Sequence, residues 1–246
     1  MGVAVPDAES SDTDEQRIAD LVVANHILFD EAVVDGFGHI SVRSVSNPAH
    51  FFMARSALVP DQVTNDDIIE YDEDSEPFDA DGRTGPTERF IHGEIYRSRP
   101  DVQAVSHSHT DAVIPFGVTS VPLKAMIHTA YFLGSEAVPV FDIRDSMGPD
   151  NAILVNNAKA GADLARTLAD RSVVLMRGHG MTVAAPSVAE AVFWAVYTRV
   201  NAQLEAAALR LGEPVFLNHF EVDRHQPVWV QWDWWAATAA ARRERK

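Results

Sequence analysis

The segment VQAVSHSH (residues 102–109) combines β-branched valines with two closely spaced histidines. Its short apolar run, interrupted by small polar residues, predicts a buried strand. Residues i and i+2 of a strand project from the same face, so the side chains of His107 and His109 are expected to point to one place. This spacing suits two imidazole ligands of a common metal ion. The alternative is that the pair is only the polar end of a strand.

A third imidazole is expected from elsewhere in the chain, because two ligands do not complete a metal site. The segment SVVLMRGHGMTVAA (172–185) predicts an apolar strand that carries His179. Gly178 and Gly180 flank this histidine and permit a close approach of the backbone. Three neutral imidazoles with coordination positions left open describe a catalytic metal site rather than a structural one.

Three further segments predict strands around the first one. HISVR (39–43) and HFFMARSALV (50–59) lie on either side of a polar SVSNP turn, which predicts a hairpin. AVPVFD (137–142) predicts another short strand.

Helical spacing and capping residues predict four main helices. A capping box at Thr13 begins the first, ERFIHGEIYRSR (88–99) forms the second, residues 157–170 form the third, and the last runs from Ser187 to Gly212. Helices that flank a mostly antiparallel sheet predict an α/β protein with a three-layer α/β/α domain.

Composition divides the chain of 246 residues into three parts. Residues 1–12 are small and acidic and predict a disordered N-terminal arm. Residues 13–220 carry all the motifs and predict one folded domain. Residues 221–246 hold four of the five tryptophans. So many tryptophans are too apolar to leave in water, so this tail is expected to pack on the domain or on a neighbouring subunit.

Charge and composition exclude several classes of function. The formal net charge is −16, so nucleic acid and anionic membrane surfaces are not expected as partners. The absence of cysteine excludes disulfides, thiolate nucleophiles and Cys-based zinc sites, which leaves histidines and carboxylates as metal ligands. No basic leader with an apolar core and no run of apolar residues long enough for a membrane helix occurs, so we expect a cytoplasmic protein.

Four motifs together resemble the class II aldolase/adducin family. They are GHISVR (38–43), TERFIHGEIYRSRPDVQAVSHSHT (87–110), VPLKAMIH (121–128) and MRGHGMTVAAPSVAEAV (176–192), and the resemblance runs from about residue 15 to residue 215. It implies a class II aldolase-like catalytic domain with His107, His109 and His179 as metal ligands and Glu88 as the acid/base. Taken alone, Glu88 is an ordinary acid in the first turn of a helix. The resemblance also implies a cyclic homotetramer.

The chain departs from the sugar-phosphate members of this family where those members hold the phosphate. The corresponding positions carry His39, Arg55-Ser56-Ala57 and Pro86-Thr87, so most of the phosphate cradle is lost. The pattern resembles instead the branch that decarboxylates 3,4-dihydroxyphthalate or a hydroxymethylpyridine dicarboxylate. It implies six substrate-binding residues, which are His39, Ser41, Arg55, Ser56, Thr87 and His128. Arg55 either grips a substrate carboxylate or is a solvated cation at a strand end.

The sequence therefore predicts a metal-dependent carbon–carbon lyase with a small carboxylate substrate, most simply a decarboxylase of a hydroxylated aromatic acid. An aldolase acting on a non-phosphorylated hydroxy acid or sugar is the alternative. An Fe(II)-dependent oxygenase and a non-catalytic adducin-like module also stay open. Zinc, manganese, cobalt and iron all suit imidazole ligands, so the sequence does not choose among them.

Overall fold

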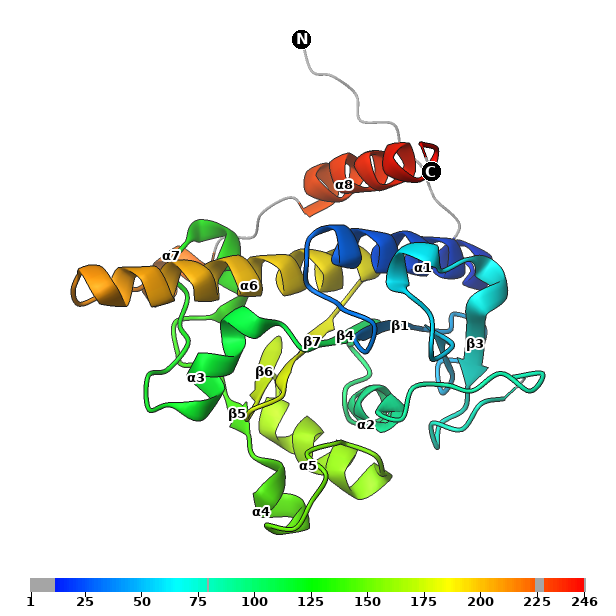
Figure 1. The fold of residues 1–246 in the computed structure, drawn as a ribbon, viewed down its shortest axis with the longest axis horizontal. Coiled ribbons are helices and arrows are strands. Elements are labelled where there is room, and N and C mark those ends of the chain that lie inside the picture. Colours follow the sequence, from blue (N-terminus) through cyan, green and yellow to red (C-terminus); the bar gives the residue numbers. More distant parts are fainter. Residues whose placement is uncertain (1–11, 79, 224–227, 246) are drawn as a thin grey trace.

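The computed structural model describes residues 12–78, 80–223 and 228–245, and in these residues one mixed sheet forms the centre of the fold (Figure 1). The strand order is β3-β2-β1-β4-β7-β6-β5. The strands are β1 (His39–Arg43), β2 (Phe51–Ala54), β3 (Ile68–Tyr71), β4 (Ala104–Ser108), β5 (Val140–Phe141), β6 (Val173–Met176) and β7 (Gly180–Ala185). β5 pairs with β6 in parallel, whereas the other neighbouring strands are antiparallel. The α/β class is confirmed.

Helices cover both faces of the sheet, which gives the three predicted layers (Figure 1). The helices are α1 (Asp14–Asp30), α2 (Arg89–Ser98), α3 (Ile114–Val118), α4 (Ile143–Met147), α5 (Ala158–Leu168), α6 (Val188–Leu211), α7 (His219–Val222) and α8 (Val228–Arg243). Short 3-10 turns are η1 (Pro60–Gln62), η2 (Asn65–Asp67), η3 (Asp111–Val113) and η4 (His128–Leu133). α1 and α6 pack on one face, α2 and α5 pack on the other, and α8 lies outside α1 and α6.

The predicted starts of the first and last main helices are confirmed by their caps. The Thr13 hydroxyl accepts from the backbone N–H of Gln16 at 3.2 Å, and the Ser187 hydroxyl accepts from that of Glu190 at 3.1 Å. Each bond satisfies one of the backbone donors that a helix leaves free at its start. The predicted N-terminal arm lies outside the described residues except for Asp12, which pairs with Arg17 at 2.7 Å.

The predicted hairpin of residues 39–59 is confirmed, but its second strand ends earlier than expected. β1 and β2 pair with Ser41 opposite Met53, and β2 ends at Ala54. The backbone N–H of Arg55 donates to Asp67 and that of Ser56 donates to Thr84, so the chain leaves the sheet at this point. Arg55 and Ser56 therefore follow the end of a strand, at the edge of a cavity described below.

The apolar segment 172–185 is not one strand, and that prediction was wrong. β6 and β7 form an antiparallel hairpin with a tight turn between Met176 and Gly180. Gly178 adopts a φ of 64°, and the backbone N–H of His179 donates to Met176 O at 3.0 Å. A left-handed residue in a tight turn favours glycine, which the sequence supplies. The turn, and not a strand end, presents His179. The predicted strand at 137–142 is likewise reduced to β5.

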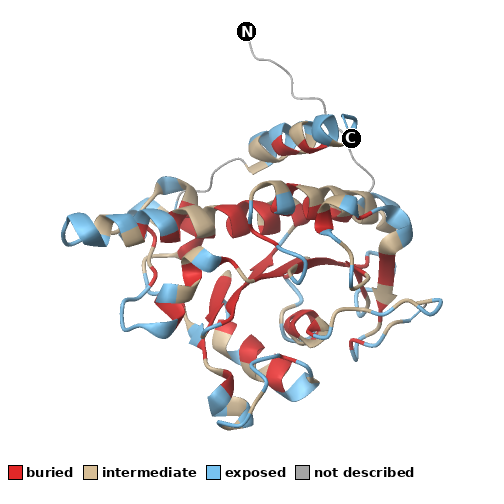
Figure 2. Ribbon diagram, in the orientation of Figure 1, coloured by how far each residue is buried: buried red, intermediate tan, exposed pale blue. Residues whose placement is uncertain are grey.

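Buried residues concentrate on the sheet and on the inner faces of the helices (Figure 2). The tryptophan-rich tail contains α8, which packs across α1 and α6. Trp235 is buried there, whereas Trp229 and Trp234 are 64% and 60% exposed in this single chain. Among the described residues, no helix combines the length and the apolarity needed to cross a bilayer.

One carboxylate in the core makes the stability of the fold depend on pH. Glu205 on α6 is buried, and its Oε2 accepts from the backbone N–H of Lys124 at 3.0 Å. Its Oε1 has no hydrogen-bond partner among the described residues. Burial raises the pKa of Glu205 to about 7. Between the ordinary Glu value and pH 7 the unfolded chain loses this proton while the folded chain keeps it, so stability falls as pH rises through that interval.

We expect Glu205→Gln to flatten this pH dependence, because an amide is neutral at every pH. The free energy of unfolding would be measured by urea denaturation at pH 5, 6, 7 and 8. The free energy of unfolding of Glu205→Gln should increase relative to that of the parent as pH rises. The exposed control Glu213→Gln should show the same pH dependence as the parent. A parallel pH dependence in Glu205→Gln and the parent would contradict the assignment.

Candidate metal centre

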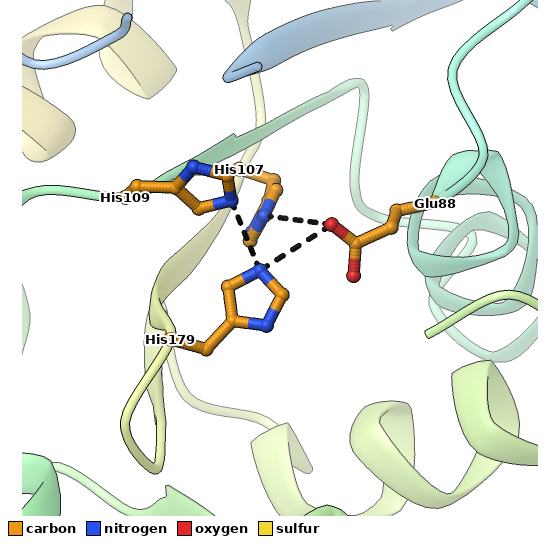
Figure 3. Close-up of side chains that lie close together, drawn as sticks. All are labelled: Glu88, His107, His109 and His179. Atoms are coloured by element: carbon orange, nitrogen blue, oxygen red, sulfur yellow. Dashed lines mark hydrogen bonds and ion pairs between the residues drawn. The ribbon is translucent and has the colours of Figure 1, made fainter. Parts of the chain in front are cut away.

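β4, α2 and the β6–β7 turn bring four side chains to one point (Figure 3). These are Glu88, His107, His109 and His179, whose ligand atoms all lie within 4.8 Å of one another. Pairing of Ser108 with Met181 places the β6–β7 turn beside the end of β4. Gly180 permits this approach, because a Cβ atom there would meet the Ser108 carbonyl oxygen at 2.0 Å.

The short distances within the cluster join ligand atoms that face a shared centre. His109 Nε2 lies 3.0 Å from His179 Nε2. Glu88 Oε2 lies 3.5 Å from His107 Nε2 and 3.3 Å from His179 Nε2. Figure 3 shows the three rings and the carboxylate turned toward one another from separate elements.

The second nitrogen of each imidazole faces an acceptor of its own. His107 Nδ1 lies 3.1 Å from Met181 O, and His179 Nδ1 lies 2.7 Å from Ile153 O. His109 Nδ1 lies 3.6 Å from the Asp35 carboxylate. Such acceptors keep the proton on Nδ1 and leave the lone pair of Nε2 for a metal.

One buried nitrogen of the cluster is not satisfied by any hydrogen bond among the described residues. His107 is fully buried, and its Nε2 has no hydrogen-bond partner among the described residues. A buried nitrogen without a partner is costly unless it binds something. Together with the orientation of the three rings, this atom makes the cluster fit a divalent cation held by nitrogen ligands.

Glu88 is held at the start of α2, where it is the N-cap residue. Its Oε1 accepts from the backbone N–H of Val155 at 2.9 Å, which leaves Oε2 facing the histidines. Burial alone would raise the pKa of Glu88, but its close contacts with the His107 and His179 imidazoles outweigh burial and hold that pKa well below its ordinary value. Glu88 is therefore an ionised carboxylate beside the cluster.

Burial and neighbouring charge act in opposite directions on two of the imidazoles. Burial, reinforced by His107 and His179, lowers the pKa of His109. Burial opposes protonation of His179 as well, but the hydrogen bond to Glu88 and its charge raise the pKa of His179 on balance. A cation bound at His179 would take the place of the proton that the ring carries beside Glu88. It would then supply the positive charge next to the Glu88 carboxylate.

A cavity of about 460 Å³ adjoins the cluster, with Glu88 and His109 in its wall. Four of the predicted substrate-binding residues line it, namely His39, Arg55, Ser56 and Thr87. Much of the remaining wall is apolar and includes Phe37, Leu58, Val63 and Leu154. The structure therefore brings these four predicted residues to one cavity together with the cluster.

Arg55 is anchored at this cavity and does not stand free in solvent. Its Nε donates to Asp67 Oδ1 at 2.8 Å, and its side chain is 34% exposed. The bond to Asp67 fixes the direction of the guanidinium, whose planar group carries further N–H donors. Arg55 can therefore present those donors to an anion at the cavity wall while Asp67 compensates part of its charge.

Two other predicted substrate-binding residues lie elsewhere. Ser41 is fully buried in β1 and contacts His92 and Tyr96. His128 is exposed at the start of η4. Neither residue is in the wall of the cavity that the structure describes.

The position of His92, one turn after Glu88 on α2, suits two roles, support of Glu88 or simple packing. In the structure its Nε2 lies 2.7 Å from His39 Nδ1. Burial lowers the pKa of His92 to about 3 and that of His39 well below its ordinary value, so both rings are neutral at neutral pH. The spacing of His92 and Tyr96, one turn apart on α2, is a signal that could have indicated a shared buried partner. Asn25 and Phe37 in the cavity wall carried no such signal.

Comparison with known proteins gives a consistent set of relatives. Residues 19–206 match the family described as Class II Aldolase and Adducin N-terminal domain. The chain is 39% identical over 199 residues to Decarboxylase tropJ of Talaromyces stipitatus, with 76% of this chain and 74% of that protein covered. It is 31% identical over 135 residues to the 3,4-dihydroxyphthalate decarboxylase of Arthrobacter keyseri, with 53% of this chain and 51% of that protein covered. The second match thus spans about half the length of that relative.

A solved structure has the same fold over nearly the whole chain. The L-fuculose 1-phosphate aldolase from Glaciozyma antarctica PI12 superposes with a TM-score of 0.76 at 20% identity, with 94% of this chain and 90% of that chain covered. At this identity the likeness concerns the fold alone.

Proposed function

The chain belongs to the class II aldolase and adducin family and is a lyase, and we propose that it is a divalent-metal-dependent decarboxylase of a hydroxylated aromatic carboxylic acid. One observation carries the proposal. Three imidazole Nε2 atoms and the Glu88 carboxylate converge beside a cavity that is largely apolar and has Arg55 at its wall. A cationic donor and apolar walls in one cavity suit an aromatic acid.

The cluster supports the metal dependence of the proposal. His107, His109 and His179 would hold the cation. When bound, a divalent cation there would polarise oxygens of the substrate and stabilise the negative charge that develops as a carbon–carbon bond breaks. Its identity among zinc, manganese, cobalt and iron is left to measurement, because imidazole suits all four.

The chain's own side chains divide the remaining work. Arg55 binds a carboxylate of the substrate, because its guanidinium offers paired N–H donors. Thr87 and Ser56 supply hydroxyl groups to polar substituents at the same wall. Glu88 takes up and returns a proton at Oε2, the oxygen that faces the cluster. The apolar residues exclude water from the ring of the substrate.

The relatives support the choice of reaction and substrate. One is named a decarboxylase and another a 3,4-dihydroxyphthalate decarboxylase, whose substrate is a hydroxylated aromatic dicarboxylate. A sugar phosphate suits this cavity poorly, because His39 and Arg55-Ser56-Ala57 stand where the sugar-phosphate members hold the phosphate. A homotetramer and a cytoplasmic location stay predictions. The largely exposed Trp229 and Trp234 on α8 support the first of them.

The test measures metal content and carbon dioxide release together. The purified protein would be stripped of metal and reloaded separately with Mn²⁺, Zn²⁺, Co²⁺ or Fe²⁺. Each form would receive a panel of aromatic mono- and dicarboxylic acids with a hydroxyl group ortho to the carboxylate. We expect uptake of about one ion per chain, and carbon dioxide release only from a loaded form.

Other outcomes would replace the proposal with a defined alternative. An aldehyde product from a non-phosphorylated hydroxy acid would indicate an aldolase. Oxygen consumption that requires Fe²⁺ would indicate an oxygenase. Failure to take up any of the four ions would favour a non-catalytic, adducin-like module.

A further inference from the structure

Four buried side chains from β1 and α2 form a continuous hydrogen-bonded chain behind the cavity. His39 Nδ1 lies 2.7 Å from His92 Nε2, and His92 Nδ1 lies 2.6 Å from the Ser41 hydroxyl. The Ser41 hydroxyl lies 2.7 Å from the Tyr96 hydroxyl. All four residues are at most 6% exposed. Of these four residues only His39 lines the cavity, so any effect of the hydrogen-bonded chain on a molecule bound there acts through the His39 ring.

The number of protons available fixes the donor-to-acceptor direction of this hydrogen-bonded chain of side chains. The Tyr96 hydroxyl has the Ser41 hydroxyl as its one hydrogen-bond partner among the described residues, so the Tyr96 proton is directed at Ser41. Ser41 then donates its proton to His92 Nδ1, and the proton of the neutral His92 ring is on Nε2. In the opposite direction the Tyr96 proton would have no acceptor among the hydrogen bonds described.

The same argument determines which nitrogen of the His39 ring carries the proton. Because His92 Nε2 donates, His39 Nδ1 must accept, and the proton of the neutral His39 ring is on Nε2. Nε2 is on the side of the ring that is turned away from His92. This state also explains why His39 is not a further metal ligand, although its ring centroid lies 5.1 Å from that of His107. Neither of its nitrogens has a free lone pair.

We propose that Ser41 and His92 are positioning residues that hold His39 as a neutral Nε2–H donor to an oxygen of the substrate. The inference rests on the proposed function for the identity of the substrate, but the state of the His39 ring belongs to the free protein. Ser41, predicted to touch substrate, acts here through two histidines instead.

The first experiment observes the tautomer without any turnover. Long-range ¹H–¹⁵N correlation spectra of histidine-labelled protein distinguish an imidazole protonated on Nε2 from one protonated on Nδ1. The spectra would be recorded with zinc and without metal, and His39→Asn would assign the His39 signals. We expect His39 to be protonated on Nε2, and Ser41→Ala to introduce the other tautomer. A parent protein with the His39 proton on Nδ1 would overturn the proposal, whether or not the protein is a decarboxylase.

The second experiment measures kinetics on whichever substrate the decarboxylation assay identifies. Ser41→Ala and His92→Phe should each lower kcat by about 10-fold or more while metal content stays unchanged, as is typical of residues that orient a catalytic group. Ser41→Thr keeps the hydroxyl and should recover most of the loss. The matched control is Ser106→Ala, which removes a buried strand hydroxyl with no partner among the described residues. Equal kcat values in Ser41→Ala and Ser106→Ala would overturn the proposal.

Discussion

His107→Ala is expected to yield a folded protein that no longer retains a divalent ion. The His107 ring is fully buried, and its Nε2 is the cluster atom with no hydrogen-bond partner among the described residues. Its removal leaves two imidazoles, which do not hold a catalytic ion against dialysis. Loss of a group that merely orients a metal ligand already costs about 10–100-fold in affinity or activity, so loss of a ligand itself should exceed 100-fold.

Metal content after dialysis and carbon dioxide release are the two measurements for this variant. Alanine in β4 leaves a small cavity beside Met181, so circular dichroism would be used to check that the sheet is intact. His50→Ala is the matched control, since His50 pairs with Glu70 outside the cluster. The control should keep the ion. Stoichiometric metal in His107→Ala would remove the foundation of the proposed function.

The centre of the fold was predictable because its pattern is local. The i, i+2 spacing of His107 and His109 requires only an extended segment through His107, and β4 runs to Ser108, the residue before His109. The capping residues Thr13 and Ser187 likewise act within one turn of their own helices. Each signal therefore survives folding without help from distant residues.

The parts that were missed depend on contacts between distant segments. The split of 172–185 into two strands was missed because apolar residues continue on both sides of the turn that carries His179, although glycines flank that histidine. The pairing of Arg55 with Asp67 needs a turn between them. The hydrogen bond between His39 and His92 joins β1 to α2 and can be seen only when the two are packed together. In each case contacts between segments distant in sequence determine the structure, and a local sequence pattern does not report such contacts.

Glu88→Gln is expected to separate metal binding from turnover. The glutamine side chain has the same shape, and its carbonyl oxygen can accept from Val155 N–H as Oε1 does now. All three imidazoles remain, so the ion should be retained. An amide cannot take up and return the proton, and general acid–base groups contribute about 10²–10⁴-fold, so kcat should fall by that factor. Glu94→Gln on the same helix makes an identical change away from the cluster and should leave kcat unaltered.

Metal analysis and carbon dioxide release on the same preparation distinguish three roles for this carboxylate. Retained metal with lost turnover identifies Glu88 as the group that moves the proton. Loss of the ion would mean that Oε2, 3.5 Å from His107 Nε2 and 3.3 Å from His179 Nε2, is itself a ligand. Undiminished turnover would show that the proton donor is misassigned. Because the Val155 N–H holds Oε1, the three outcomes differ in what the other oxygen, Oε2, does at the cluster.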